Sequence, residues 1–192
     1  MATTKVLILY FSRGGATQRL ADSIAEGVTQ ANGEPLLRTI ESDQDAASSR
    51  DLAITKADID SCDALILGSP TRFGHMASGL QKFWESTSNE WLKGTLINKP
   101  GAVFTSTSSL HGGQESTLLS LALPLLHHGM FLTGIPYSQP SLHGDQAGGS
   151  PYGASHLQQS QTLSDNEQKS AQALGRRVCQ LACVCRDSDI DS

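Results

Sequence analysis

Apolar residues along this chain gather in short runs, which alternate with longer segments of helical periodicity. The short runs predict five strands, at residues 5–11, 35–40, 63–68, 101–107 and 130–136. The periodic segments predict helices at about 17–31, 76–87, 114–128 and 164–184. Strands that alternate with helices in this way are typical of a parallel sheet covered on both faces.

Local signals mark several of the expected helix ends. Ser164 and Glu167 have the spacing of a capping box at the start of the last helix. Gly129 can end the preceding helix, in which Pro124 predicts a kink or an open last turn. The polar segment 41–58 is expected to be irregular or only weakly helical.

The order of these elements predicts a flavodoxin-like α/β fold. This is a three-layer sandwich with a five-stranded parallel sheet in the order 2-1-3-4-5 and helices on both faces. A length of 192 residues suggests a single domain, which we expect over residues 1–186 with a polar tail at 187–192. In this fold, ligands bind at the carboxyl ends of the strands, where the strand order reverses.

The first strand leads directly into a small loop and the start of a helix. The loop residues are Ser12, Arg13, Gly14, Gly15, Ala16 and Thr17. A helix start offers unpaired N–H groups and a partial positive charge, so it favours an anion. The loop lacks the Gly-Lys-Ser/Thr of a nucleotide triphosphatase and the Gly-x-Gly-x-x-Gly of a dinucleotide site. A single terminal phosphate, as in FMN, fits better, although Ser, Gly and Thr also favour an ordinary βα turn.

Two more loops rich in polar residues follow the third and fourth strands, at 70–75 and 106–114. All three loops belong to the same edge of the predicted sheet. An ordinary scaffold has no need for Gly, Ser, Thr, Arg and His at all three places. Their coincidence indicates a binding site more strongly than any one loop does.

The composition limits which binding partners and which cellular location we expect. The formal net charge is −5 and the pI is about 5.6, which gives no general footprint for nucleic acid. The sequence shows neither a membrane-spanning segment nor a signal peptide, so we expect a cytoplasmic protein.

Two features of the carboxyl-terminal part of the chain say less about its function. Cys179, Cys183 and Cys185 have a spacing that is poor for zinc, so we expect no metal site and interpret them as small apolar residues that pack the last helix. The long aperiodic segment 138–163 is expected to be partly ordered near the binding site.

Several blocks of sequence together resemble one known family. They are Ser69-Pro-Thr-Arg-Phe-Gly-His-Met76, His111-Gly-Gly-Gln-Glu115, Leu126-His-His-Gly-Met130 and Gly149-Ser-Pro-Tyr-Gly-Ala154. Over residues 4–180 the chain is similar to the tryptophan-repressor-binding-protein family, the flavodoxin-like NAD(P)H:quinone oxidoreductases.

The resemblance implies an enzyme that binds FMN without a covalent bond. It implies two-electron reduction of quinones by NADH or NADPH, with ping-pong hydride transfer through flavin N5. It further implies a homotetramer in which neighbouring subunits close each site, with a quinone and a nicotinamide as small-molecule partners.

The resemblance also assigns residues to the site, beginning with the phosphate loop named above. The loop that flanks the flavin ring is Thr71, Arg72, Phe73 and Gly74. The third loop is Ser106, Thr107, Ser108, Ser109, Leu110, His111 and Gly112. His127 corresponds to a histidine near the reacting face of the flavin, and is the candidate proton donor to the quinone. Trp91 corresponds to the wall of the substrate pocket.

Other interpretations stay open from the residues themselves. Gly14 stands where related proteins often carry a Tyr that touches the nicotinamide. By spacing alone, His127 is as expected for a residue that ends a helix, and His128 is interpreted as structural. Two rival functions are a flavodoxin-type one-electron carrier and a non-catalytic protein of the same fold that binds a flavin or a partner.

Overall fold

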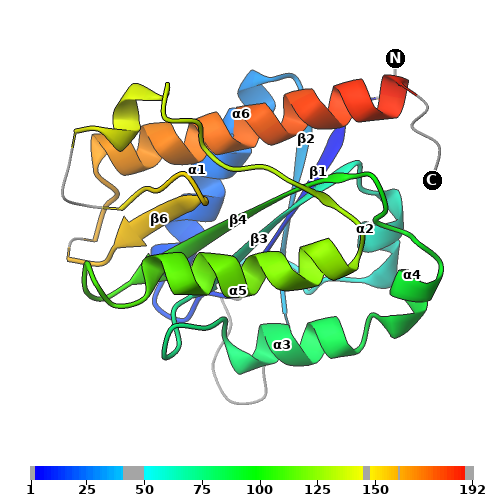
Figure 1. Cartoon of the computed structure of the whole chain (residues 1–192), viewed down its shortest axis with the longest axis horizontal. Coiled ribbons are helices and arrows are strands. Elements are labelled where there is room, and N and C mark those ends of the chain that lie inside the picture. Colours follow the sequence, from blue (N-terminus) through cyan, green and yellow to red (C-terminus); the bar gives the residue numbers. More distant parts are fainter. Residues whose placement is uncertain (1–2, 41–49, 145–147, 160, 189–192) are drawn as a thin grey trace.

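A computed structural model of the chain describes residues 3–40, 50–144, 148–159 and 161–188. Its centre is a parallel sheet that lies between two layers of helices (Figure 1). The strand order is β2-β1-β3-β4-β5, and β6 also pairs with β4. The predicted flavodoxin-like order is therefore confirmed, with one more strand than the sequence suggested.

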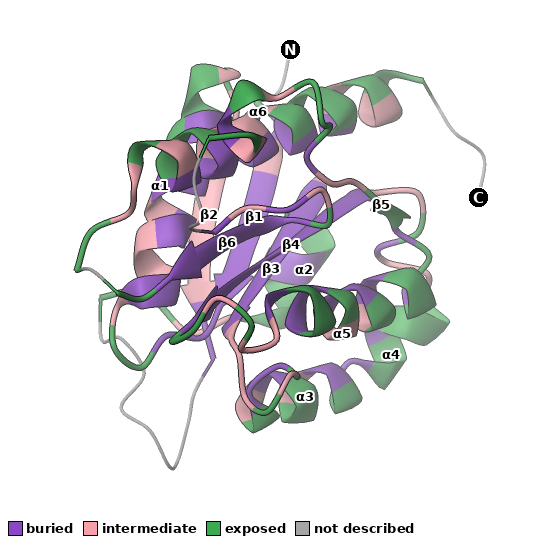
Figure 2. Ribbon diagram, turned by 60° about the vertical axis from the view of Figure 1, so that its left-hand side comes forward, coloured by how far each residue is buried: buried purple, intermediate pink, exposed green. Residues whose placement is uncertain are grey.

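The four long strands come from the apolar runs of the sequence. Their bounds are β1 Lys5–Tyr10, β2 Glu34–Thr39, β3 Ala64–Pro70 and β4 Pro100–Thr107. Leu7 of β1 pairs with Leu36 of β2 on one side and with Leu65 of β3 on the other. The central strands β1, β3 and β4 are almost wholly buried, because helices cover both faces of the sheet (Figure 2).

The helices divide between the two faces of the sheet. On one face lie α1 (Ala16–Gln30) and α6 (Asp165–Asp187), while α3 (Ser78–Glu85) and α5 (Gln114–His127) lie on the other (Figure 1). Two shorter helices are α2 (Lys56–Ser61) and α4 (Ser88–Leu92). Glycines let α1 and α6 pack closely, since a Cβ on Gly175 would lie 2.2 Å from the Ile24 carbonyl oxygen.

The fifth strand differs from its prediction. Strand β5 has only two residues, Phe131–Leu132, and it pairs with Pro100 and Gly101 at the start of β4. The chain then leaves the sheet, forms a short 3-10 helix at Pro140–Leu142, and returns as β6 (Ala154–Leu157) beside the end of β4. Two separate segments therefore fill the place of one predicted strand.

Two predictions about helices were also incomplete. The helix expected at 76–87 ends at Glu85, and α4 follows it as a separate helix. Helix α2 forms at the end of the segment expected to be irregular, of which residues 41–49 lie outside the described residues. Helix α5 continues through Pro124 to His127, where the His128 N–H bonds to the Pro124 carbonyl at 3.0 Å.

The local signals at the start of α6 and at the end of α5 are confirmed. Ser164 and Glu167 form the capping box of α6, and Gly129 ends α5 with a φ of 77°.

Cys179 is buried as expected, whereas Cys183 and Cys185 are only partly buried on α6. Of the predicted tail 187–192, residues 189–192 lie outside the described residues. In the described part of the chain, every helix is too short or too polar to cross a membrane.

Candidate functional site

The structure brings the three polar loops together at the carboxyl edge of the sheet, as their order in the chain predicts. Hydrogen bonds join all three. The hydroxyl oxygens of Thr17 and Ser106 lie 2.9 Å apart, and the Thr71 N–H donates to the Ser106 carbonyl at 2.9 Å. Thr117 on α5 also donates to the Thr71 hydroxyl at 2.7 Å. The loops therefore form one connected rim rather than three separate turns.

A pocket of about 370 Å³ lies between the first loop and the ends of β3 and β4. Its lining comprises Ser12, Arg13, Gly14, Ala16, Thr17, Pro70, Arg72, Ser106 and Gln158. Helix α1 opens into it through Gly15, which has a φ of 82° and provides no side-chain cap. The Gln18 N–H in the first turn of α1 donates to the Ser12 hydroxyl at 3.4 Å. Backbone N–H groups at a helix start, hydroxyls and arginines are the donor set that binds a phosphate.

Two acidic side chains, Asp22 and Asp51, share one arginine as their partner. Arg50 bonds to Asp22 and Asp51, each at 2.8 Å, and the Tyr10 hydroxyl donates to Asp51. Burial and the hydrogen bond to Asp51 hold the pKa of Tyr10 well above its usual range, so the phenol stays neutral. This cluster ties the end of β1 and the middle of α1 to the segment after β2, and its two carboxylates and one guanidinium together carry a single negative charge.

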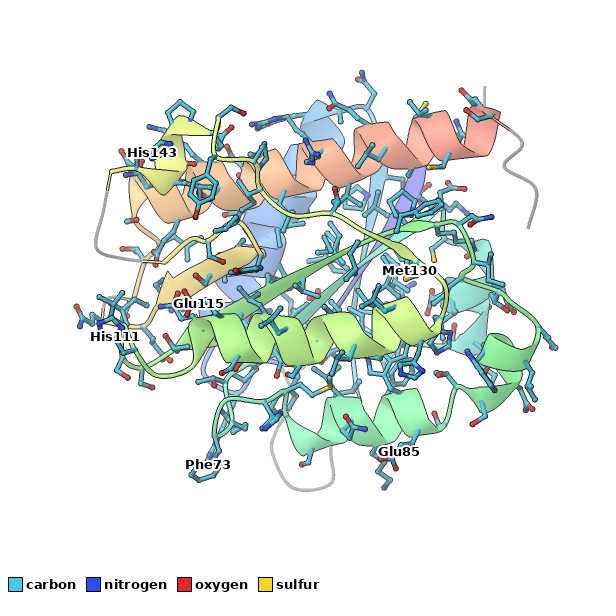
Figure 3. The ribbon with its side chains drawn as sticks, in the orientation of Figure 1. Phe73, Glu85, His111, Glu115, Met130 and His143 are labelled. Atoms are coloured by element: carbon cyan, nitrogen blue, oxygen red, sulfur yellow. The ribbon has the colours of Figure 1, made fainter. Side chains whose placement is uncertain are left out.

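The second loop forms a tight turn that projects from the rim. Arg72 and His75 exchange backbone hydrogen bonds at 2.8 and 3.0 Å, with Phe73 and Gly74 between them. Both turn residues have positive φ, 53° for Phe73 and 82° for Gly74, as a two-residue hairpin turn requires. Phe73 is fully exposed and points away from the body of the protein (Figure 3).

The third loop leads to a second uncapped helix start. Thr107 is buried, accepts a hydrogen bond from Gln114 at 3.2 Å and donates to the Ser109 carbonyl at 3.0 Å. Ser108, Ser109 and His111 are exposed, while Leu110 and Gly112 are partly buried. Helix α5 begins after Gly113, which has a φ of 96° and no side-chain cap. The rim therefore offers several backbone donors, of the kind that the polar edge of a flat ring needs.

The two loops pack tightly against each other beside this helix start. A Cβ on Gly113 would lie only 3.0 Å from the Cα of Gly74. Larger residues at these two positions would push the loops apart. The contact therefore explains the glycines in the Phe-Gly and His-Gly-Gly blocks.

His127 and Trp91 lie together, but at the far end of α5. Gly129 and Met130 donate to the carbonyls of Leu126 and Leu125, and among the described residues no backbone N–H donates to the His127 carbonyl. The Trp91 indole N–H donates to that carbonyl at 2.8 Å. At 1.5 Å per residue, the helix places His127 about 20 Å from the third loop. Figure 3 shows this separation, with His111 at one end of α5 and Met130 at the other.

His128 points inward beneath this helix end. Thr87 donates its hydroxyl hydrogen to the Trp84 carbonyl at 2.7 Å, so its oxygen accepts from His128 Nε2 at 3.0 Å. Burial lowers the pKa of His128, which favours the neutral ring. These contacts agree with the structural role expected for His128.

A long groove of about 1260 Å³ connects the rim to the far end of α5. It runs between α3 and α5, from Arg72 and Phe73 to Trp91 and His127. His75 and Met76 also line it; His75 belongs to the polar loop 70–75 predicted at the site and Met76 follows it, but neither was assigned a role. Gln158 lines the smaller pocket and was also missed, because it lies in a segment without periodicity or motif.

The sheet order and the loops at its carboxyl edge define a flavodoxin-like protein, and comparison with solved structures agrees. A WrbA-like flavodoxin protein from Agrobacterium tumefaciens superposes with a TM-score of 0.73 at 24% identity, covering 95% of this chain and 99% of that one. A flavodoxin from the domain Archaea has a TM-score of 0.68 at 17% identity, covering 94% and 99%. These likenesses confirm the fold.

Sequence comparison then identifies the family. Residues 4–138 match the family model of the NADPH-dependent FMN reductases. A protein of Gluconacetobacter diazotrophicus named NAD(P)H dehydrogenase (quinone) is 42% identical, over 93% of this chain and 97% of its own length. One of the same name from Chromohalobacter salexigens is also 42% identical over the same shares. The chain belongs to the NADPH-dependent FMN reductase family, and its resemblance to the tryptophan-repressor-binding proteins is confirmed.

Proposed function

We propose that this chain is an FMN-dependent enzyme that reduces quinones by two electrons from NADH or NADPH. The observation that carries the proposal is the uncapped start of α1 in a pocket that buries the hydroxyls of Ser12, Thr17 and Ser106. The names of the relatives and the FMN reductase family support the activity.

The residues at the rim fit FMN. The small pocket receives the phosphate, with donors from Ser12, Thr17, Ser106 and the first turn of α1. The loops 71–74 and 107–112 then flank the ring and direct N–H groups and hydroxyls at its polar edge. Bound FMN supplies a ring that takes two electrons from a nicotinamide and passes them to a quinone. The two substrates use one pocket in turn, so parallel lines are expected in double-reciprocal plots.

A second copy of the chain completes the site. Helix α5 carries Leu119, Leu123 and Leu126 on its outer face, and each of these is about half exposed. Trp91 beside them is also half exposed. Reacting groups must come within about 3.5 Å, yet His127 lies about 20 Å from the rim of its own chain. A neighbouring copy that covers this face can receive Trp91 and His127 at its own rim.

In this assembly His127 donates a hydrogen bond or a proton to the quinone oxygen, since its ring nitrogens can act as donors. Trp91 forms the wall of the substrate pocket and also holds the backbone of His127 in place. The assembly is the homotetramer that the resemblance implies, and the enzyme acts in the cytoplasm.

The central test is a mixing experiment with FMN followed by an assay. The purified chain should take up FMN at micromolar concentration and then oxidise NADH or NADPH promptly when benzoquinone is added. Reduction that requires a separate reductase would favour a one-electron carrier. A chain that remains colourless after mixing with FMN would contradict the proposal.

The assembly is tested separately with a charge on the outer face of α5. Leu123→Glu should give a smaller particle by light scattering and lose most quinone turnover, while FMN stays bound. Leu181→Glu is the matched control, because Leu181 is also exposed but lies on α6, on the other face of the sheet. Full activity of the dissociated Leu123→Glu protein would show that each copy works alone.

A further inference from the structure

One wall of the small pocket comes from a part of the chain to which neither the three loops nor the resemblance assigns a role. Gln158 follows directly after β6 and lines the pocket together with Ser12, Thr17 and Ser106. It lies more than 40 residues beyond the third loop in sequence. The pairing of β6 with the end of β4 brings it to the rim.

The backbone holds Gln158 firmly at this place. Its N–H donates to the Thr107 carbonyl at 2.8 Å, so the pairing of β4 with β6 extends to the third loop. Its side chain reaches across to the phosphate loop, since a Cβ on Gly14 would lie 3.7 Å from Gln158 Nε2. Within the described ranges, no residue accepts a hydrogen bond from this amide. Two N–H groups are therefore available at the mouth of an anion pocket.

A buried carboxylate anchors the segment that carries Gln158. Glu167 on α6 accepts hydrogen bonds from the backbone of Leu157 at 2.8 Å, of Gly148 at 3.1 Å and of Ser164 at 2.8 Å. Its second oxygen also lies 2.9 Å from His156 Nδ1, and both side chains are almost completely buried. Because three backbone donors already require an acceptor there, His156 donates through Nδ1. One side chain thus joins α6, the end of β6 and the loop before it.

We propose that Gln158 is a phosphate-binding residue of this chain and that Glu167 is its positioning residue. The ligand group is a phosphomonoester, which accepts hydrogen bonds and carries negative charge. The proposal depends on the binding of FMN in this pocket, and it adds a fourth wall that the three loops do not provide. A neutral amide suits this position, because a carboxylate there would repel the phosphate.

The test compares FMN with riboflavin, which has the same ring but no phosphate. Gln158→Ala should weaken FMN about tenfold, because a hydrogen bond to a charged group is lost, and should leave riboflavin binding unchanged. Gln158→Glu should weaken FMN further, again without effect on riboflavin. Fluorescence titration of each flavin measures both affinities.

Gln159→Ala and Gln159→Glu are the matched controls, because Gln159 is the next residue and lies outside the pocket lining. Neither should change either affinity. Equal losses of FMN and riboflavin in the Gln158 variants would overturn the proposal, and so would unchanged FMN binding. If the unmodified protein already binds riboflavin as tightly as FMN, the phosphate site of the proposed function fails instead.

The positioning role of Glu167 is tested by combining a substitution at Glu167 with one at Gln158. Glu167→Gln should weaken FMN relative to riboflavin, and adding Gln158→Ala should cause little further loss, because both changes remove the same contact. Independent, additive losses would contradict the link between the two residues. Circular dichroism checks that each variant is folded, and the Gln158 variants decide the ligand contact even if Glu167→Gln does not fold.

Discussion

Helices α2 and α6 begin in closed networks of hydrogen bonds, whereas α1 and α5 begin at bare glycines. Thr55 and Asp58 form a complete capping box at the start of α2, as Ser164 and Glu167 do in α6. The two glycine starts both lie at the rim, where loops from three strands meet. A cap satisfies the free N–H groups of a helix, and its absence leaves them for a ligand. Among these four helices, the comparison separates starts that stabilise the fold from starts that lie open at the rim.

The largest effect should come from breaking the closed start of α6. Glu167→Ala leaves several buried N–H groups without an acceptor, and each unsatisfied group costs about 1–3 kcal/mol. We therefore expect the free energy of unfolding to fall by about 3 kcal/mol or more. Urea denaturation measures the loss. Glu26→Ala is the control, because Glu26 bonds to Gln172 at the exposed surface and its removal should change little.

The carboxyl end of α5 should respond in the opposite way, with loss of activity rather than of stability. His127→Ala should lower quinone turnover about 100-fold, as the loss of a general acid does, while FMN stays bound. His143→Ala is the control, because His143 is exposed and lies near the 3-10 helix on another part of the surface. Full turnover of His127→Ala would reduce His127 to a residue that ends the helix.

The open start of α1 is tested by Thr17→Val, which keeps the shape of the side chain but removes its hydroxyl. FMN affinity should fall about fivefold or more, since one hydrogen bond is worth about 1 kcal/mol. Thr29→Val is the control at the other end of α1, where the Thr29 hydroxyl bonds only to the Ala25 carbonyl at 3.0 Å among the described residues. Unchanged FMN affinity of Thr17→Val would place the phosphate elsewhere.

Acid should weaken the hydrogen-bond networks that cap the starts of α2 and α6. Burial alone would raise the pKa of Asp58 and of Glu167, but hydrogen bonds from Arg38 to Asp58 and from His156 to Glu167 outweigh it and hold both pKa values below the usual range. The folded state therefore gains stability while these groups are ionised. The gain is complete above the ordinary carboxyl pKa of about 4 and is lost as the pH falls through the lower values of the folded state.

Urea denaturation at decreasing pH checks this prediction. The stability difference between the unmodified protein and Glu167→Gln should shrink by about 1 kcal/mol or more as the pH falls below 4. A difference that stays constant would mean that Glu167 keeps the same pKa in the folded and unfolded chain.

Much of the fold could be predicted because each signal is local. The apolar runs identify β1, β3 and β4, and the Ser164–Glu167 spacing marks the start of α6. The rim follows from the strand order, because parallel strands bring their carboxyl ends to one edge. Those parts of the prediction depend on a few neighbouring residues and on one general rule.

The rest of the fold and of the candidate site depends on contacts between distant parts of the chain, which the sequence does not display. Strand β6 has only four residues and is stabilised by its pairing with β4 and by Glu167. Its sequence is too short to show a periodicity that would predict a strand. Gln158 was missed for the same reason. The resemblance named His127, but the sequence does not display the hydrogen bond from Trp91 to its carbonyl.

The division of the last strand position between β5 and β6 gives the sheet two independent borders. The first half of β4 is bordered by Phe131 and Leu132, and its second half by a segment that begins 22 residues later at Ala154. The excursion between them is itself anchored, because Ile135 is buried in the core and the Gly148 N–H donates to Glu167 at 3.1 Å. Protein engineers could therefore change exposed positions of that excursion, such as Tyr137 and Tyr152, while both borders stay intact.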